Sequence, residues 1–371
     1  MTTLFSPFQF RDLQIPNRIV VSPMCQYVAV DGKAGAWHVT HYGGLASSGA
    51  GLLFIESTAV EPEGRITPGD LGLWDETTYS ALAHVVEGIR AHTPTRVILQ
   101  ISHAGRKSSS EVPWRKGQLI PPDAGGWRPF GPSAIPHRLD EAPPIALDAA
   151  GLRRVREAFV AAARRAVRLG ADGLELHGGH GYLLHEFLSP ISNERTDAYG
   201  GSLENRMRYP LEVIEAVREV LPSGMPMGIK ISASDWMDNG WDLAQSIEFA
   251  KEAKKREIDW VTASSGGISP SQRIQVAPNY QVPFSKGIRD GAGVNTIAVG
   301  LITTPKQAED VVASGSADLV ALARAMLFNP RWGWHAAAEL GGSIGGVPPS
   351  YWRAIPQGHS ELFSDTVFGT R

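Results

Sequence analysis

The sequence is poor in cysteine and has no excess of charge of either sign. Cys25 is the one cysteine among 371 residues. A single thiol excludes an internal disulfide, and it excludes zinc or iron–sulfur sites built from cysteine ligands. The 35 basic and 38 acidic residues give a net charge of −3. This balance gives no reason to expect nucleic acid or an anionic membrane as a partner.

Long apolar runs are also missing. No run approaches the ~20 residues that a helix needs to cross a bilayer. Residues 1–7 lack the basic and apolar regions of a secretory signal peptide, so we expect a cytoplasmic protein. With 43% hydrophobic and 20% charged residues, the composition is that of a globular protein with a large core.

What the sequence does contain is a regular alternation of short apolar runs with helical patterns. The expected strands are residues 19–22, 51–57, 96–102, 173–176, 227–232, 260–264, 295–299 and 319–322. Helical segments expected between them include 40–48, 75–92, 205–221, 243–256 and 305–314, and a longer helix with Asp148 as its N-cap. Eight strands joined by helices predict parallel pairing and closure into an α/β fold, the (β/α)8 TIM barrel.

We expect one domain over residues 1–371, opened by a hairpin at 8–15. The alternation stops between 108 and 147, where proline and glycine are dense. We interpret that segment as an excursion over the barrel mouth and residues 341–371 as a C-terminal tail. The arginines of the helix after Asp148 fall largely off its apolar stripe, which predicts a solvated face.

The most informative stretch is the turn that follows the strand at 173–176. His177, His180 and Tyr182 are separated there almost entirely by glycines. Glycine lets the backbone fold tightly, so that the rings can be directed at one point. Because polar groups beyond the C-terminal ends of strands form the active sites of barrels, this turn predicts an active site.

Other strand ends carry groups that fit a phosphorylated cofactor. Gly300 follows the seventh strand and Ala323-Arg324 the eighth, and the sixth ends in the glycine-rich turn 264–267. Backbone amides with one guanidinium suit a phosphate, so we expect one at these loops. Lys230 lies within an apolar strand, where a buried amine is costly without an anionic partner.

At these residues the chain resembles the Old Yellow Enzyme family of flavin-dependent ene-reductases, in particular its thermophilic-like subclass of NADPH dehydrogenases and xenobiotic reductases. The resemblance runs from about residue 4 through the C-terminal region. It rests on SPMCQY at 22–27, QISHAGRK at 100–107, HGGHGY at 177–182 with residues 189–206, KISASD at 230–235, and AR at 323–324.

The resemblance implies non-covalent FMN at the barrel mouth. The residues implied to line the isoalloxazine are Ser22, Pro23, Met24, Cys25 and Ala59. By the same resemblance, Gln100 bonds the pyrimidine edge, Lys230 lies near N1 and O2, and Gly300, Ala323 and Arg324 hold the phosphate. The family usually has arginine at 230 and glycine at 323. Lysine keeps the charge but loses the bidentate fork, which affects the flavin potential.

The resemblance further implies a reaction. NADPH or NADH reduces FMN, and hydride passes to the β-carbon of an alkene conjugated to a carbonyl or nitro group. His177 and His180 would bond the electron-withdrawing oxygen, assisted by Tyr27, and Tyr182 would protonate the α-carbon. Cys25 would tune the flavin rather than act as a nucleophile. Arg353 would enter a neighbour's site in a homodimer or homotetramer.

Three alternatives remain open from the residues alone. His177 and His180 have a spacing that occurs in metal sites, which would suit a metal-dependent hydrolase or lyase. A barrel that binds a phosphorylated ligand without turnover is the second. The third is a flavin 2-hydroxy-acid oxidase, although no arginine pair for a carboxylate is evident.

Overall fold

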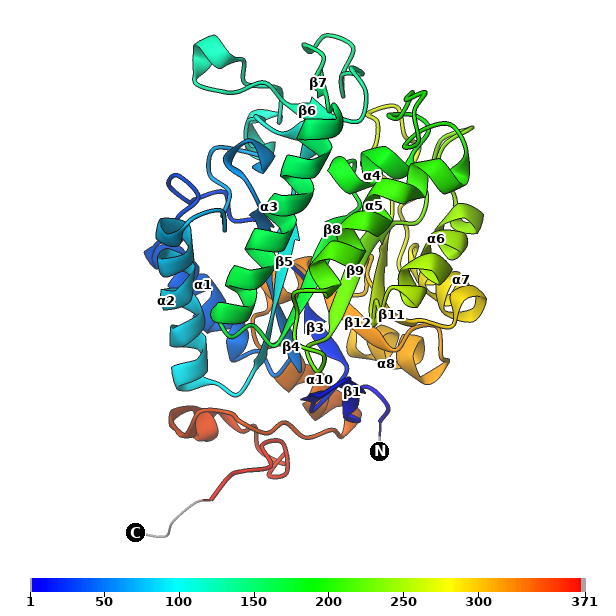
Figure 1. Cartoon of the computed structure of the whole chain (residues 1–371). Coiled ribbons are helices and arrows are strands. Elements are labelled where there is room, and N and C mark those ends of the chain that lie inside the picture. Colours follow the sequence, from blue (N-terminus) through cyan, green and yellow to red (C-terminus); the bar gives the residue numbers. More distant parts are fainter. Residues whose placement is uncertain (1, 368–371) are drawn as a thin grey trace.

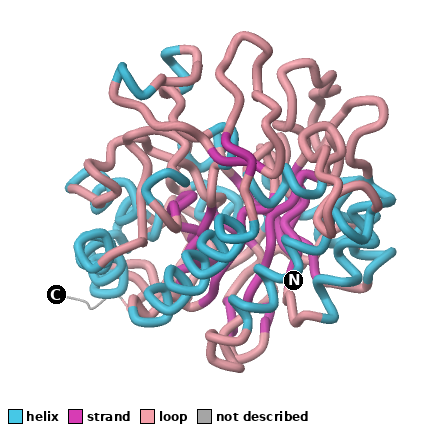
Figure 2. Tube along the Cα trace, turned by 45° about the horizontal axis from the view of Figure 1, so that its top comes forward, coloured by secondary structure: helices cyan, strands magenta, loops and turns pink. Residues whose placement is uncertain are grey.

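The computed structural model describes residues 2–367, so residue 1 and residues 368–371 of the expected domain lie outside the described residues. Eight parallel strands close into a barrel, as the sequence predicts, and helices surround it (Figure 2). The strands are β3 (Ile19–Val21), β4 (Leu52–Ala59), β5 (Arg96–Ser102), β8 (Gly173–Gly178), β9 (Met227–Ser232), β10 (Trp260–Ser264), β11 (Asn295–Ala298) and β12 (Leu319–Leu322).

Helices surround these strands on the outside of the barrel (Figure 2). They are α1 (Ala36–Ala46), α2 (Glu76–His92), α3 (Ala149–Arg168), α4 (Leu183–Leu188), α5 (Leu203–Arg218), α6 (Leu243–Lys255), α7 (Val282–Ala292), α8 (Pro305–Ala313), α9 (Arg324–Phe328) and α10 (Trp332–Leu340). Asp148 caps α3 by accepting the Gly151 N–H at 2.7 Å, which confirms the predicted helix start.

A hairpin closes the N-terminal end of the barrel. Strands β1 (Phe8–Phe10) and β2 (Leu13–Ile15) pair antiparallel, as the sequence predicts. Phe10 packs on Trp260 with ring centroids 5.1 Å apart, and Phe54 lies 6.2 Å from the same indole. All three side chains are buried, so this end is a filled apolar floor.

The excursion at 108–147 lies above the C-terminal strand ends, where β6 (Phe130–Gly131) and β7 (Ile145–Ala146) pair (Figure 1). Hydrogen bonds from two side chains join this segment to neighbouring loops, one from outside it and one from within it. The Arg106 guanidinium donates to the carbonyls of Ile135 and Pro136 at 3.3 Å. The Trp127 indole N–H donates to the carbonyl of Glu63 at 2.9 Å. The segment is therefore tied to the mouth of the barrel.

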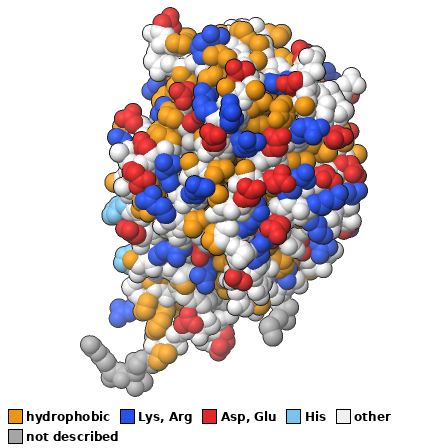
Figure 3. Space-filling view, viewed as in Figure 1, with side chains coloured by type: hydrophobic (Ala, Val, Ile, Leu, Met, Phe, Trp, Pro, Cys, Tyr) orange, Lys and Arg blue, Asp and Glu red, His pale blue; other side chains and the backbone are white. Residues whose placement is uncertain are grey.

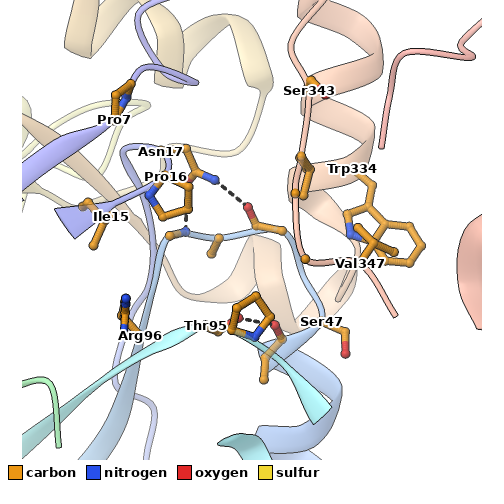
Figure 4. A pocket seen from close by; sticks show the side chains of 18 of the residues that line it. Pro7, Ile15, Pro16, Asn17, Ser47, Thr95, Arg96, Trp334, Ser343 and Val347 are labelled. Carbon is orange, nitrogen blue, oxygen red and sulfur yellow. Dashed lines mark hydrogen bonds between the residues drawn. The ribbon is translucent and has the colours of Figure 1, made fainter. Parts of the chain in front are cut away.

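The C-terminal tail lies at the other end, below the barrel (Figure 1). There Ile344 bridges to Phe363, and both pack with Trp334. A cavity of about 390 Å³ separates part of the tail from the barrel floor, with Trp334 and Val347 on one wall and Pro16 and Asn17 on the other (Figure 4).

The arginines of α3 lie on the surface among acidic side chains (Figure 3). Arg168 pairs with Glu76 at 2.9 Å and Arg156 with Glu212 at 3.3 Å. This mixture of charges is that of a solvated helix face. None of the helices within residues 2–367 has the length and apolar character that a membrane span requires.

Candidate active site

The turn after β8 is held in an unusual backbone conformation. His180 has φ +56° and Gly181 has φ +74°. A Cβ on Gly181 would lie 2.1 Å from the carbonyl oxygen of Gly267, and one on Gly267 would lie 2.5 Å from the His180 backbone. The two glycine turns therefore touch backbone to backbone, which only residues without side chains allow.

Lys107 fixes this contact. Its ammonium donates to the carbonyl of His180 at 2.8 Å and to that of Gly267 at 3.1 Å. It also lies 5.3 Å from the centroid of the Tyr182 ring. Burial, with Arg106 nearby, lowers the pKa of Lys107 to about 8. Lys107 therefore joins the loops that follow β8 and β10.

The three rings predicted to act together do lie together. The centroid of His177 is 5.0 Å from that of His180 and 4.8 Å from that of Tyr182. The Gly179 N–H donates to His177 Nδ1 at 3.2 Å, which leaves the proton on Nε2, and Nε2 faces His180 Nδ1 at 3.2 Å. His180 Nε2 in turn lies 2.8 Å from the Ser264 hydroxyl.

Burial, with the Lys230 charge, lowers the pKa of both histidines well below the usual value. Burial raises the pKa of Tyr182 well above the usual value. The imidazoles are therefore neutral and the phenol is protonated at neutral pH. Each of the three rings can donate a hydrogen bond without carrying charge.

Lys230 lies at the level of the histidines, because His177 is its partner in the β8–β9 ladder. One layer deeper, Glu175 is fully buried and accepts from Gln100 at 2.7 Å and from the Trp260 indole at 3.1 Å. Burial lowers the pKa of Lys230 and the Glu175 charge opposes that shift. Glu175 is thus the anionic neighbour that a buried amine requires.

The loop after β3 forms another wall of the mouth. Tyr27 adopts φ +58°, and its ring meets that of Trp114 edge-on with centroids 5.6 Å apart. Cys25 is half-buried beside it, and burial with the Asp70 and Glu56 charges raises the pKa of its thiol. A protonated thiol is a poor nucleophile, which agrees with a tuning role for Cys25.

Of the loops expected to bind phosphate, those after β11 and β12 have backbone amides available for it. The ends of β11 and β12 are adjacent, and the amides of Gly300, Ala323 and Arg324 have no acceptor within residues 2–367. The exposed Arg324 guanidinium makes no hydrogen bond or ion pair there either. Ala323 has φ −106°, a conformation that does not require the family's usual glycine.

The expectation that the turn 264–267 contributes to phosphate binding was wrong. The amides of both its glycines are already used, since Gly266 donates to the Ser234 carbonyl at 2.8 Å and Gly267 donates to Gln272 Oε1. The turn instead supports the histidine turn.

The polar groups left over around the mouth fit FMN. The Ser22 hydroxyl is buried without a hydrogen-bond partner, and the Lys230 amine donates to no acceptor within the described chain. Pro23, Met24 and Ala59 add half-buried or buried surface beside them. A hydroxyl, an amine and unused amides at the ends of β3, β9, β11 and β12 match a flavin with a phosphate tail.

The donor set does not fit a metal. Among the described residues, no group of three or more His, Cys, Asp and Glu side chains is arranged to hold a metal ion. The two nitrogens of His180 already face His177 and Ser264. The alternative of a metal-dependent hydrolase or lyase therefore loses its site.

Sequence reasoning missed the residues that support the site from neighbouring strands. Gln281 donates to the Val299 carbonyl at 3.0 Å and accepts from Ser265 at 2.7 Å, and thereby joins the ends of β10 and β11. Its helix, α7, was not foreseen because few of its residues are apolar and buried. No spacing in the sequence marks these contacts.

Arg353 is not brought to the mouth of its own chain. It lies in the short helix η5 (Pro349–Ala354) of the tail, at the opposite end of the barrel (Figure 1). Its predicted entry into a site therefore concerns a neighbouring copy.

Comparison with known proteins agrees with this site. Residues 3–341 match the model of the NADH:flavin oxidoreductase / NADH oxidase family. The chain is 44% identical to an NADPH dehydrogenase of Geobacillus thermodenitrificans, over 92% of this chain and 96% of the relative. It is 41% identical to an NADPH dehydrogenase of Bacillus licheniformis, over 95% and 98%.

Among solved structures, morphinone reductase superposes with a TM-score of 0.76 at 27% identity, covering 98% of this chain and 93% of that one. Together with the barrel and the residues at its mouth, these likenesses show the cofactor and the reaction type. The chain belongs to the NADH:flavin oxidoreductase / NADH oxidase family, and it is an FMN-dependent, NAD(P)H-dependent oxidoreductase of the Old Yellow Enzyme type.

Proposed function

We propose that this oxidoreductase is an ene-reductase that saturates an alkene conjugated to a carbonyl or nitro group. The supporting observation is the cluster of His177, His180 and Tyr182, three neutral donors within one turn above Lys230. Bound FMN supplies the redox chemistry, hydride uptake from NADPH or NADH and hydride release to the second substrate. The residues of the chain bind and polarise that substrate.

The histidines act on the electron-withdrawing oxygen. His177 Nε2–H is directed at His180 Nδ1, and a substrate oxygen that binds beside the pair takes that hydrogen bond in place of His180. When the His180 ring turns from Ser264, its own N–H becomes the second donor. As hydride reaches the β-carbon, negative charge develops on this oxygen. A donor placed for developing charge is worth about 2.7–4 kcal/mol in a well-studied hydrolase. Tyr27, on the opposite wall, adds a third polar contact.

Tyr182 delivers the proton to the α-carbon. Its raised pKa keeps the phenol protonated until a carbanion forms beside it. Once the proton has left, the Lys107 ammonium 5.3 Å from the ring centroid faces a phenolate and stabilises it. The product gains a hydride and a proton, and one nicotinamide is oxidised.

Rapid mixing of Tyr182→Phe tests the assignment. We expect the reoxidation of the reduced flavin by 2-cyclohexenone to slow by about 10²-fold, because a general acid contributes at least that much. Reduction of the same variant by NADPH needs no acid and is the internal control. Equal losses in both half-reactions would reject the proton-donor role, and no loss in either would also reject it.

We also propose that Arg353 completes the mouth of a second copy in a homodimer or homotetramer. This is supported by its place on an exposed tail remote from its own mouth. Arg353→Ala should raise KM for the alkene several-fold in an oligomer of unchanged sedimentation. Unchanged kinetics in an intact oligomer would contradict the proposal.

A further inference from the structure

Glu56 carries a buried carboxyl group on the barrel wall that the proposed reaction does not use. It lies in β4, where the ladder with β5 shifts register between Ile55 and Thr58. Between these two positions, two residues of β4 lie opposite one residue of β5, so one extra residue bulges the strand at this point. Bulges redirect a side chain, and Glu56 is fully buried.

The Glu56 side chain is bonded to two other elements. Its Oε2 accepts the backbone N–H of Gln26 at 2.7 Å, and its Oε1 accepts the Tyr42 hydroxyl at 2.9 Å. The Tyr42 oxygen accepts the Glu56 N–H in return at 2.9 Å. Gln26 is the residue between Cys25 and Tyr27. One carboxyl group therefore joins the loop that carries Cys25 and Tyr27 to β4 and α1.

The loop needs such an anchor because its conformation is strained. Tyr27 holds φ +58°, and a Cβ on Gly69 would lie 2.4 Å from the Tyr27 carbonyl oxygen. Gln26 adds two side-chain bonds, to the Met24 carbonyl at 2.8 Å and from the Trp37 indole at 3.0 Å. A left-handed tyrosine persists only where its surroundings fix it.

Charged and titratable groups face Glu56 and the loop from each neighbouring element. From α1, His38 Nε2 lies 3.6 Å from Oε1. Asp70, buried in the loop before α2, acts electrostatically on Glu56 and Cys25, and Lys230 of β9 acts on Cys25. Burial raises the pKa of Glu56 to about 8, so this carboxyl gains its charge in mildly alkaline solution.

We propose that Glu56 is a positioning residue that fixes Cys25 against the flavin and Tyr27 against the substrate by anchoring the N–H of Gln26. The part that concerns Tyr27 rests on the proposed ene-reductase function. The part that concerns Cys25 does not, because it acts on the flavin whatever the second substrate is.

Two substitutions of Glu56 separate position from charge in the holoenzyme. Glu56→Asp keeps the charge but is one methylene too short to reach Gln26, so KM for 2-cyclohexenone should rise about tenfold with a smaller change in kcat. Glu56→Gln keeps the length but removes the charge. Its FMN midpoint potential should be more positive than that of the unaltered protein above pH 8 and similar well below it.

Asp70→Asn is the matched control, because it removes a buried carboxyl that faces Cys25 without a contact to Gln26. It should leave KM unchanged. Should both Glu56 variants fail to fold, Tyr42→Phe removes one donor to the carboxylate. Tyr42→Phe should raise the pH at which the FMN midpoint potential changes its slope. The reason is that the Tyr42 hydroxyl bond, which favours the ionised form of Glu56, is lost.

The FMN midpoint potential is measured without any alkene. A shift in this potential therefore supports the role of Glu56 even if the protein proves not to reduce alkenes. An FMN midpoint potential that is unchanged in Glu56→Asp, where the bond to the Gln26 N–H is lost, and in Tyr42→Phe would overturn the part of the proposal that concerns Cys25. A KM for Glu56→Asp that does not change would overturn the part that concerns Tyr27.

Discussion

The two ends of the barrel differ in what they leave unsatisfied. At the mouth, the Ser22 hydroxyl and the Lys230 amine lack hydrogen-bond partners within residues 2–367, and Tyr27 and His180 hold left-handed backbone. At the floor, Phe10 packs at a tilt on Trp260, and Phe54 meets the same indole edge-on. The difference shows that one end is kept ready for ligands, while the other only has to hold the strands together.

Polar groups follow the same division. Glu56 and Glu186 near the mouth are buried, and burial raises the pKa of each to about 8. At the floor, Asn17 is also buried, but both atoms of its amide are bonded: it donates to the Gly49 carbonyl at 2.9 Å and accepts from Gly51 and Ile19 (Figure 4). These bonds of Asn17 join the start of β3 to the turn before β4, so they serve structure.

The largest effect should come from the mouth. Replacement of both His177 and His180 by alanine removes two donors to the substrate oxygen, and we expect kcat/KM for enones to fall by at least ~10³-fold. FMN content, read from visible absorbance, should stay unchanged. Replacement of the exposed His84 and His92 is the matched control. If the variant without His177 and His180 still reduced enones at the normal rate, the mouth would not be the catalytic end of the barrel.

The next effect belongs to the floor. Phe10→Ala removes a buried ring from the hairpin and should lower the free energy of unfolding by about 3–5 kcal/mol. The rate of flavin reduction in the folded protein should not change, because Phe10 lies far from the mouth. Phe328 is 93% exposed, so Phe328→Ala should leave unfolding unchanged. A loss of activity that exceeds the loss of folded Phe10→Ala protein would contradict the separation.

A pH effect should follow from the buried carboxyls at the mouth. Burial raises the pKa of Asp70 from 3.8 to about 7. The folded state therefore binds a proton that the unfolded state releases, and this contribution to stability is complete below about pH 4 and is lost as pH rises through 7. Calorimetry should show a Tm that falls between pH 5 and 8, with a shallower fall in Asp70→Asn. If Tm fell equally with pH in the unaltered protein and in Asp70→Asn, Asp70 would not contribute to the pH dependence of stability.

The smallest effect tests an outer helix that belongs to neither end. Asp148→Ala removes the cap of α3 and should lower the free energy of unfolding by about 1 kcal/mol. Kinetics should stay the same, and Asp140→Ala, at an exposed loop position, should have no measurable effect in urea unfolding. A larger loss than at Phe10 would mean that the helix ring, not the floor, limits stability.

The barrel could be read from the sequence because its signals are local. Each strand is a short apolar run, and α3 carries a clear stripe and a cap, so both were placed within a few residues. Helix α7 was missed because it contains glycines at 287 and 291 and buries few apolar side chains. Its place is decided by packing on α6, which no local pattern shows.

The site was predictable to the extent that its residues share one turn or follow strand ends. His177, His180 and Tyr182 are neighbours in the chain, so their association needed no tertiary information. The contacts of Glu56 with Gln26 and of Lys107 with Gly267 join segments 30 and 160 residues apart. Such contacts depend on strand order and register. The same is true of the hydrogen bonds that already occupy the amides of Gly266 and Gly267 and leave them unavailable to phosphate.

The central claim is that the mouth of this barrel holds FMN and directs hydride to a polarised alkene. An anaerobic titration tests it most directly: the purified protein is reduced with one equivalent of NADPH and then mixed with 2-cyclohexenone. We predict that the flavin absorbance is lost and then fully restored, with one cyclohexanone formed per flavin. A flavin that bleaches and stays reduced across enones, maleimides and nitroalkenes would contradict the account.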